Sequence, residues 1–265
     1  MTDAGIRVER RGGVVEVVLD RADRKNALDV VAVTAIIEVL ESAAMDDTAR
    51  VVLLRGEGPD FCSGADWVSA NANPDQKPRT GSLQRRVPLQ AHRLIELLTE
   101  IQLPVVCAVR GWAAGLGCQL ALAADFTIAA DDCTFWEPFL ERGFTPDSGA
   151  SWLLPRLVGL ARARELLLLG RKLTGREAAD WGLIHRAVGV DVLDAEVAAL
   201  VEHLATAPTV AVGLAKATLN RGLSAGLRDA MTAEANALEL SSRTKDFREG
   251  LTAFREGRPP SFEGR

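Results

Sequence analysis

Short apolar runs alternate with longer amphipathic segments in the first half of the chain. Four runs rich in β-branched or aliphatic residues are bounded by glycine, proline or charged residues, and each predicts a buried strand: 14–19, 51–54, 105–109 and 126–129. The segments up to about Ala44 and over 89–101 have helical spacing, and Asp29 is placed to cap the first. Strands that alternate with helices predict a parallel sheet with right-handed crossovers.

Beyond about Gly159 the spacing of apolar residues is helical almost throughout. The expected helices are 161–169, 176–181, 192–207, 209–221 and 227–255. We therefore expect an α/β core over residues 1–200 and a C-terminal helical region over 201–265. Helices that cannot cover their own apolar faces usually pack against neighbouring subunits. Residues 69–86 are rich in Asn, Pro, Gln and charge, which predicts a mobile surface segment.

Composition narrows the classes of partner. The 265 residues carry a formal net charge of -5, which disfavours nonspecific nucleic-acid binding. No apolar run reaches the roughly 18 residues that span a bilayer. The polar segment 1–11 does not resemble a targeting peptide, so we expect a cytoplasmic protein without membrane association. The four cysteines form no CxxC pair, and no histidine lies at ligand spacing from them, which predicts reduced thiols and no metal site.

Two glycine-containing loops follow two of the predicted strands. FCSGAD at 61–66 comes after the strand at 51–54, and GWAAGLGCQ at 111–119 comes after the strand at 105–109. Where a strand ends and a helix begins, the first backbone N–H groups lack internal partners. Two such loops side by side can direct two N–H donors at one developing oxyanion. Each loop alone is also explained by tight turns, and neither has the GxGxxG or GxxxxGK[ST] spacing of nucleotide-binding loops.

Several motifs in a fixed order carry a resemblance to a known family. They are RADRKNAL at 21–28, FCSGAD at 61–66, PVVCAVRGWAAGLG at 104–117, LPRLVGLARARELLLLGRKLTGREAADWGLI at 154–184 and EGLTAFREGRPPSF at 249–262. In this order and spacing they resemble the crotonase superfamily, the enoyl-CoA hydratase/isomerase family, over nearly the whole chain. The resemblance implies an α/β fold, a crotonase-like spiral of ββα units with a helical C-terminal trimerisation region. It also implies a homotrimer or a dimer of trimers.

The same resemblance implies an acyl-CoA thioester substrate and no cofactor beyond its CoA moiety. The thioester carbonyl would lie between the backbone N–H groups of Ala65 and Leu116, where Leu116 replaces a glycine common in the family. The residues implied in CoA binding are Arg24, Lys25, Ala27, Leu28, Ala65, Asp66, Trp67, Phe254 and Arg258. The last two resemble residues that reach the CoA of a neighbouring subunit. The cationic members are equally consistent with solvated surface charges.

At two positions the chain departs from the pattern of the hydratases. Hydratases of the family hold a water between two glutamates, and the aligned residues here are Gln119 and Phe139. An amide cannot exchange a proton at neutral pH, and phenylalanine has no polar group. Hydration by the usual pair of glutamates is therefore not expected. Glu137 and Glu141 flank the second position and would substitute only if their side chains reached inward.

The candidate acid/base is Asp147. It lies in GFTPDSGASWLLPRLVG at 143–159, which resembles ring-1,2-epoxyphenylacetyl-CoA isomerases and other enoyl-CoA isomerases. In those relatives a carboxylate at this position moves a proton between carbons of the acyl chain. Such a role needs a pKa near the working pH, and the apolar neighbours Phe139, Phe144 and Trp152 would raise the pKa of Asp147 by desolvation. Alternatively, Asp147 caps a helix that begins near residue 150.

Other functions stay open on the same scaffold. His92 and Asp147 align with a histidine and an aspartate of 4-chlorobenzoyl-CoA dehalogenases, where the aspartate attacks an aromatic carbon and the histidine activates water. The dehalogenase tryptophan is Phe139 here, which counts against this function.

We therefore expect an isomerase that uses Asp147. The second alternative is a hydratase, hydrolase or dehalogenase that uses Asp147 with His92 or a nearby glutamate, and the third is a non-catalytic acyl-CoA-binding homologue. The acyl pocket is expected to be apolar, with four aromatic residues: Trp136, Phe139, Phe144 and Trp152.

Overall fold

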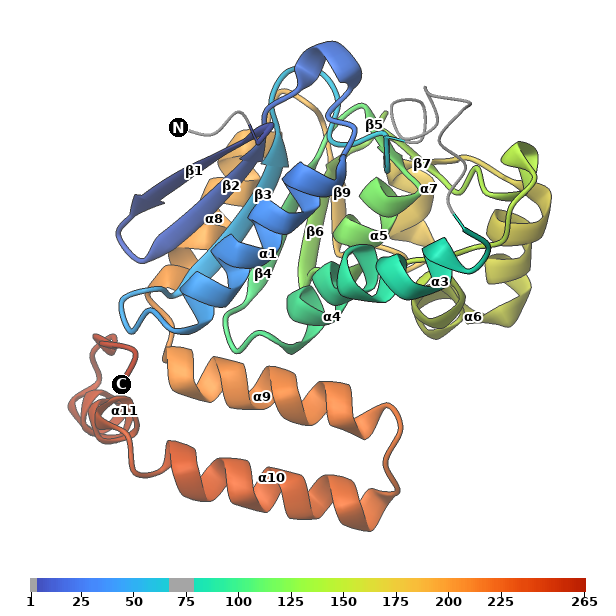
Figure 1. Cartoon of the computed structure of the whole chain (residues 1–265). Helices are drawn as coiled ribbons and strands as arrows, with labels where there is room; N and C mark the ends of the chain where they lie inside the picture. Colours follow the sequence, from blue (N-terminus) through green and yellow to red (C-terminus); the bar gives the residue numbers. More distant parts are fainter. Residues whose placement is uncertain (1–3, 67–78) are drawn as a thin grey trace.

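The computed structural model describes residues 4–66 and 79–265, and its centre is a mostly parallel sheet (Figure 1). The strands of this larger sheet, in spatial order, are β1 (Ile6–Arg11), β2 (Val14–Leu19), β3 (Val51–Gly56), β4 (Val105–Val109), β6 (Phe126–Ala130) and β9 (Arg186–Val188). β1 and β2 form an antiparallel hairpin, and the other neighbours pair in parallel. Every residue of β4 is buried, as expected for a central strand covered on both faces.

A smaller sheet runs beside the larger one. It contains β5 (Trp112–Ala114), β7 (Thr134–Trp136) and β8 (Leu173–Thr174). Single bridges between Leu28 and Ala65 and between Cys62 and Ala113 continue the same stacking toward the N-terminus. Successive turns of the chain thus add one strand to the larger sheet and one short strand or bridge to the smaller. This is a spiral of ββα units, and the predicted fold class is confirmed.

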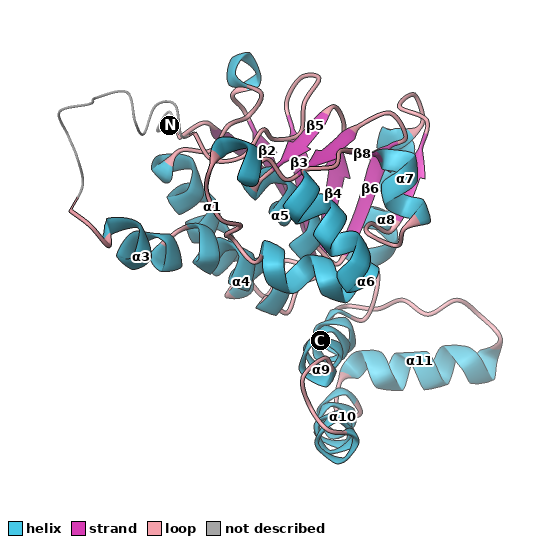
Figure 2. Ribbon diagram, turned by 90° about the vertical axis from the view of Figure 1, so that its right-hand side faces the viewer, coloured by secondary structure: helices cyan, strands magenta, loops and turns pink. Residues whose placement is uncertain are grey.

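Helices cover both faces of the larger sheet (Figures 1 and 2). The helices of the body are α1 (Val30–Ala44), α3 (Ser82–Arg86), α4 (Ala91–Glu100), α5 (Leu116–Ala123), α6 (Ala150–Leu169), α7 (Gly175–Asp180) and α8 (Leu193–Ala205). Short 3-10 turns are η1 (Ala22–Arg24), η2 (Val87–Leu89) and η3 (Leu140–Arg142). Asp29 caps α1 by accepting a hydrogen bond from the Ala32 N–H, as predicted. α6 is interrupted by a non-helical Gly159.

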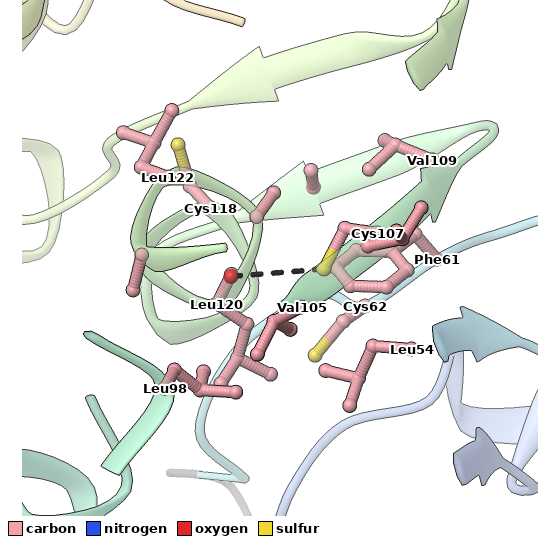
Figure 3. Close-up of a cluster of buried hydrophobic side chains, with 14 of the residues drawn as sticks. Leu54, Phe61, Cys62, Leu98, Val105, Cys107, Val109, Cys118, Leu120 and Leu122 are labelled. Atoms are coloured by element: carbon pink, nitrogen blue, oxygen red, sulfur yellow. Dashed lines mark hydrogen bonds between the residues drawn. The ribbon is translucent and has the colours of Figure 1, made fainter. Parts of the chain in front are cut away.

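The apolar core lies between the larger sheet and α5, all of whose residues are buried. Figure 3 shows side chains of this core from β3, β4, α4, α5 and the 61–66 loop: Leu54, Val105, Cys107, Val109, Leu98, Cys118, Leu120, Leu122, Phe61 and Cys62. The Cys107 thiol donates to the Leu120 carbonyl at 3.7 Å. The four cysteines are free and buried, and burial raises the pKa of each thiol, which leaves them inert.

Three helices follow the body: α9 (Thr209–Gly222), α10 (Leu227–Ser241) and α11 (Lys245–Glu256). The chain bends by 104° between α8 and α9, and the three helices extend away from the sheet (Figures 1 and 2). The buried Lys216 ammonium anchors α9, because it donates to the carbonyls of Leu98 and Leu103 at 2.8 and 3.2 Å and pairs with Asp125 at 2.7 Å. Every residue of α10 remains at least partly exposed.

Three details differ from the expectations. Residues 69–86 were expected to form a mobile surface segment, but their C-terminal part forms the helix α3. This helix continues directly into η2 and α4. The expected helix over 227–255 is broken into α10 and α11, since Thr244 caps a new helix by accepting from the Phe247 N–H at 3.0 Å. α8 packs on the larger sheet and ends at Ala205, before the end expected for this helix at residue 207. Within the described ranges, no single helix is long and apolar enough to cross a membrane. The bent pair α8 and α9 reaches that length and apolar composition only when the two helices are taken together.

Candidate active site

The stacking of two successive turns brings the two glycine loops together. The Cys62 N–H donates to the Trp112 carbonyl at 2.8 Å, and the Ala114 N–H donates to the Cys62 carbonyl at 2.9 Å. Beyond this pairing the chains stay in close contact, because a Cβ atom added to Gly64 would lie 2.6 Å from the Ala114 oxygen and 3.4 Å from the Leu116 nitrogen. Only glycine at position 64 allows this approach, and its φ of +98° also favours glycine.

The two predicted donors lie on either side of this contact. Leu116 begins α5, so its N–H belongs to the first turn and has no partner inside the helix. The N–H of Ala65 makes no hydrogen bond in the part of the chain that the structure describes. The Leu116 side chain, in place of the family glycine, is buried in the core. Two such N–H groups near the positive end of a helix are the arrangement that an oxyanion hole requires.

The segment predicted to bind CoA lies directly beside the 61–66 loop. The N–H groups of Ser63 and Asp66 donate to the carbonyls of Lys25 and Leu28, and the Leu28 N–H donates to the Gly64 carbonyl. Asn26 fixes the position of this segment, since its side-chain amide donates a hydrogen bond to the Asp60 carbonyl at 2.7 Å. Leu28 is thereby held in a single parallel bridge with Ala65.

The cationic residues of this segment have partners within the chain. Arg24 pairs with Asp66 at 3.4 Å, and Lys25 lies 3.9 Å from the Asp60 carboxylate. The Lys25 ammonium also lies 5.5 Å from the centre of the Trp112 ring. Both cationic side chains are more than half exposed, so a phosphate group can reach them. Trp67, the remaining predicted CoA-binding residue of this region, lies outside the described residues.

Asp147 precedes α6 and faces the interior only in part. Burial raises the pKa of its carboxyl, while a hydrogen bond from Ser148 and the charge of His92 lower it by less. The structure thus brings His92, at the start of α4, within electrostatic range of Asp147. The helix-capping alternative is wrong, because the N-cap of α6 is Gly149 and no side chain accepts a hydrogen bond from its first turn. Ser148, next to Asp147, has a strained φ of +49°.

Of the four aromatic residues expected in the acyl pocket, two come together. The rings of Phe139 and Phe144 meet edge to face at 5.7 Å. Trp136, the last residue of β7, packs instead on Trp112 of β5, with the ring centres 5.9 Å apart. Trp152 is 43% exposed, and the Arg156 guanidinium lies 4.1 Å from the centre of its ring. Desolvation of Asp147 by Trp152 is therefore not supported by this arrangement.

Gln119 forms a contact that the sequence did not reveal. Its side-chain amide is fully buried and donates to Oε1 of Glu137, which is 2% exposed. Burial raises the pKa of Glu137 to about 8, and the Asp147 charge adds to the increase. Glu141, the other acid next to Phe139, is exposed. Of the two flanking glutamates, only Glu137 reaches inward.

The predicted C-terminal CoA contacts lie on and after α11. Phe254 is 87% exposed, and Arg258 pairs with Glu249 and Glu256 on the same helix. α11 lies apart from α5 in both views of the chain (Figures 1 and 2). Among the described residues, no group of three His, Cys, Asp or Glu side chains could hold a metal ion.

Two site features escaped the sequence analysis. The first is Asn26, whose backbone has a φ of +54° and whose buried side-chain amide holds the segment from Arg24 to Leu28 against the 61–66 loop. The sequence held a signal for this role, because Asn is among the few residues that tolerate the left-handed region of backbone conformation. The second feature is the hydrogen bond between Gln119 and Glu137. The sequence held no signal for it, since the two residues belong to a helix and to the end of a strand that meet only in the fold.

Comparison with known proteins agrees with this geometry. A family model described as "Enoyl-CoA hydratase/isomerase" matches residues 9–265. The chain is 37% identical to a 1,2-epoxyphenylacetyl-CoA isomerase from Escherichia coli (strain K12) over 254 residues, which cover 96% of each chain. It is also 37% identical to a "Probable enoyl-CoA hydratase" from Rhodobacter capsulatus, over 98% of each chain. The crystal structure of an enoyl-CoA hydratase from Bacillus anthracis superposes with a TM-score of 0.91 at 31% identity, over 98% of this chain and 100% of that one.

Proposed function

The chain belongs to the enoyl-CoA hydratase/isomerase family, and from that premise we propose that it is an acyl-CoA isomerase with Asp147 as its acid/base. The observation that carries the proposal is the combination of an oxyanion hole at Ala65 and Leu116 with Asp147, a partly buried carboxyl of raised pKa. The same loops support binding of CoA along Arg24 to Leu28 and beside Asp66 and Trp67.

In the proposed reaction the ionised Asp147 takes a proton from a carbon of the acyl chain. The electron pair of that C–H bond moves toward the thioester carbonyl, whose oxygen becomes an enolate held by the N–H groups of Ala65 and Leu116. Asp147 then returns the proton at another carbon, and the double bond has shifted. The reaction consumes no water and involves no redox change. A single carboxyl that first accepts and then returns the proton is therefore sufficient as the acid/base.

The residues at the water-activating positions favour isomerisation over hydration. Gln119 gives its amide to Glu137, and Phe139 packs on Phe144, so neither offers a base to a water molecule. The relatives carry both isomerase and hydratase names, so this choice rests on the residues of this chain.

A specific observation favours one alternative. The charge of His92 acts on Asp147, which is the pairing expected if Asp147 attacks an acyl carbon or ring and His92 activates water. That alternative covers a hydrolase or a dehalogenase. It predicts incorporation of solvent oxygen, whereas isomerisation predicts none.

Incubation of the protein with 3-enoyl-, 2-enoyl- and aromatic-ring CoA thioesters in heavy-oxygen water separates these functions. Isomerisation leaves the mass of the thioester unchanged and moves the double bond, which NMR detects. Hydration adds the mass of one labelled water, hydrolysis releases CoA, and dehalogenation replaces halogen by labelled oxygen. Binding of the thioesters without any product would establish a non-catalytic homologue.

We also propose that the active protein is a homotrimer or a dimer of trimers in which Phe254 and Arg258 approach a neighbouring CoA. Large apolar residues on the C-terminal helices remain exposed in the single chain, among them Leu227, Leu238 and Phe254. Light scattering of the purified protein would measure the mass. A monomer that still binds CoA thioesters would refute this assembly.

A further inference from the structure

Two buried polar side chains next to the oxyanion hole lack half of their hydrogen bonds. Gln119 is fully buried and Glu137 is 2% exposed. The Nε2 atom of Gln119 donates to Oε1 of Glu137, while Gln119 Oε1 and Glu137 Oε2 have no hydrogen-bond partner. Both unpartnered atoms are oxygens, and both are acceptors when Glu137 is ionised. Buried polar atoms are normally paired, so this arrangement requires an explanation.

One proton on Glu137 explains it. A neutral carboxylic acid and a primary amide can join by two hydrogen bonds, in which the amide N–H donates to the acid carbonyl and the acid O–H donates to the amide oxygen. That proton supplies the donor that the two oxygens lack. No cation is among the described groups that act on Glu137: hydrogen bonds with Cys118 and Gln119 lower its pKa by less than burial raises it, and the Asp147 charge adds to the increase. An isolated buried carboxylate would be costly.

The pair lies against the first turn of α5. Gln119 follows Leu116 by one helical turn, and helical side chains lean toward the N-terminus, so Gln119 covers the turn that carries the Leu116 N–H. Glu137 follows Trp136, whose carbonyl accepts a hydrogen bond from the Gly115 N–H at 2.9 Å. The acid and the amide thus brace the helix start from two elements. A change in their bonding moves the donor of the hole.

We propose that Glu137 is a positioning residue: as a neutral acid bonded twice to the Gln119 amide, it fixes the first turn of α5 and the Leu116 donor, and leaves Asp147 as the ionised carboxylate of the site. The role of Leu116 and Asp147 in this statement rests on the proposed function. The pairing of Glu137 with Gln119 does not, and can be tested without turnover.

The pair makes the site sensitive to alkaline pH. When Glu137 ionises, one of its two hydrogen bonds to Gln119 is lost and a second negative charge appears near Asp147. Cys118 on α5 and Asp147 before α6 are the titratable groups that face Glu137 in the described structure, and Leu154, Leu166 and Leu183 line its remaining side. Burial raises the pKa of Cys118 well above its usual range, so that thiol stays neutral while Glu137 loses its proton next to the Asp147 carboxyl.

Two variants of Glu137 test the proposal in the full-length protein. Glu137→Gln keeps both hydrogen bonds at every pH, because a second amide donates and accepts as the neutral acid does. Glu137→Leu removes both. We expect kcat of the wild type to fall on the alkaline side with a midpoint near the pKa of about 8 of Glu137, and this fall to be absent in Glu137→Gln. We expect Glu137→Leu to lower kcat roughly 10- to 100-fold with a smaller change in KM, because the Leu116 donor shifts.

The proposal is overturned if Glu137→Gln shows the same alkaline fall as the wild type, or if Glu137→Leu folds and keeps the wild-type kcat. Infrared spectroscopy of the substrate-free protein provides a readout independent of catalysis. At neutral pH the wild type should show the carbonyl band of a protonated carboxylic acid that Glu137→Gln lacks and that disappears as pH rises. Absence of that difference refutes the neutral pair, whatever the outcome of the activity assays on Asp147.

Discussion

Substitution of Gly64 by alanine should disable the oxyanion hole while leaving the fold in place. The φ of Gly64 is +98°, where an alanine is strained by about 1–3 kcal/mol. The new Cβ would also lie 2.6 Å from the Ala114 oxygen. The atoms that the new Cβ would meet are backbone atoms of regular elements, since Ala114 ends β5 and Leu116 begins α5. The clash therefore cannot be relieved by rotating a side chain.

The magnitude follows from the distance that the loops must move. An ordinary van der Waals contact begins at 3.4 Å, so the two loops must separate by about 0.8 Å. Misplacement of a catalytic group by about 1 Å costs roughly 10²-fold, and loss of one donor of an oxyanion hole costs about 10²–10³-fold. We expect Gly64→Ala to lower the rate of α-proton exchange on a bound acyl-CoA by roughly 10²-fold.

Gly12→Ala is the matched control. Gly12 also has a positive φ, +55°, but nothing lies within 4 Å of the added Cβ, so this variant carries strain without a clash. The assay is deuterium exchange into the acyl chain in D₂O, followed by NMR, with the melting temperature of each variant measured in parallel. If Gly64→Ala is folded and exchanges within twofold of Gly12→Ala, the close approach of the two loops does not set the hole.

Two further predictions concern stability. Lys216→Met leaves the buried Asp125 carboxylate without its cation, so we expect the free energy of unfolding in urea to fall by about 3–5 kcal/mol. The double variant Lys216→Met/Asp125→Asn should recover part of this loss. Equal stability of Lys216→Met and the wild type would contradict the anchoring role of Lys216. The raised pKa of Glu137 means that its contribution to stability is complete below its ordinary pKa of about 4.5 and is lost as pH rises through the folded-state pKa of about 8. Relative to Glu137→Gln, the wild type should therefore lose about 1.4 kcal/mol per pH unit between pH 5 and 8, measured by calorimetry, and a constant difference would count against the buried neutral acid.

The sequence predicts those features that depend on local pattern. Runs such as 14–19 and 105–109 become strands because β-branched residues fit a buried sheet, and Asp29 caps α1 because its carboxylate can reach the Ala32 N–H. The two loops could be assigned because each follows a buried strand.

Features that depend on the stacking of distant turns could not be predicted. The closeness of Gly64 to the Leu116 nitrogen arises only when two turns of the spiral pack together. Whether Glu137 or Glu141 turns inward is decided by Gln119, which reaches Glu137 from α5. Trp152 was expected beside Asp147, but the turn of α6 that carries it faces outward and Arg156 covers its ring. The apolar residues of α10 stay exposed in the single chain, so nothing within the chain fixes what they pack against.

The central claim is that Asp147 transfers a proton between carbons of an acyl-CoA. The most direct test is the reaction of a 3-enoyl-CoA in D₂O with the wild type and with Asp147→Asn, whose amide keeps the size of the side chain but cannot accept the proton. We predict migration of the double bond and uptake of deuterium at the α or γ carbon with the wild type, and loss of both with Asp147→Asn although the thioester still binds. Full migration and exchange by Asp147→Asn would contradict the claim.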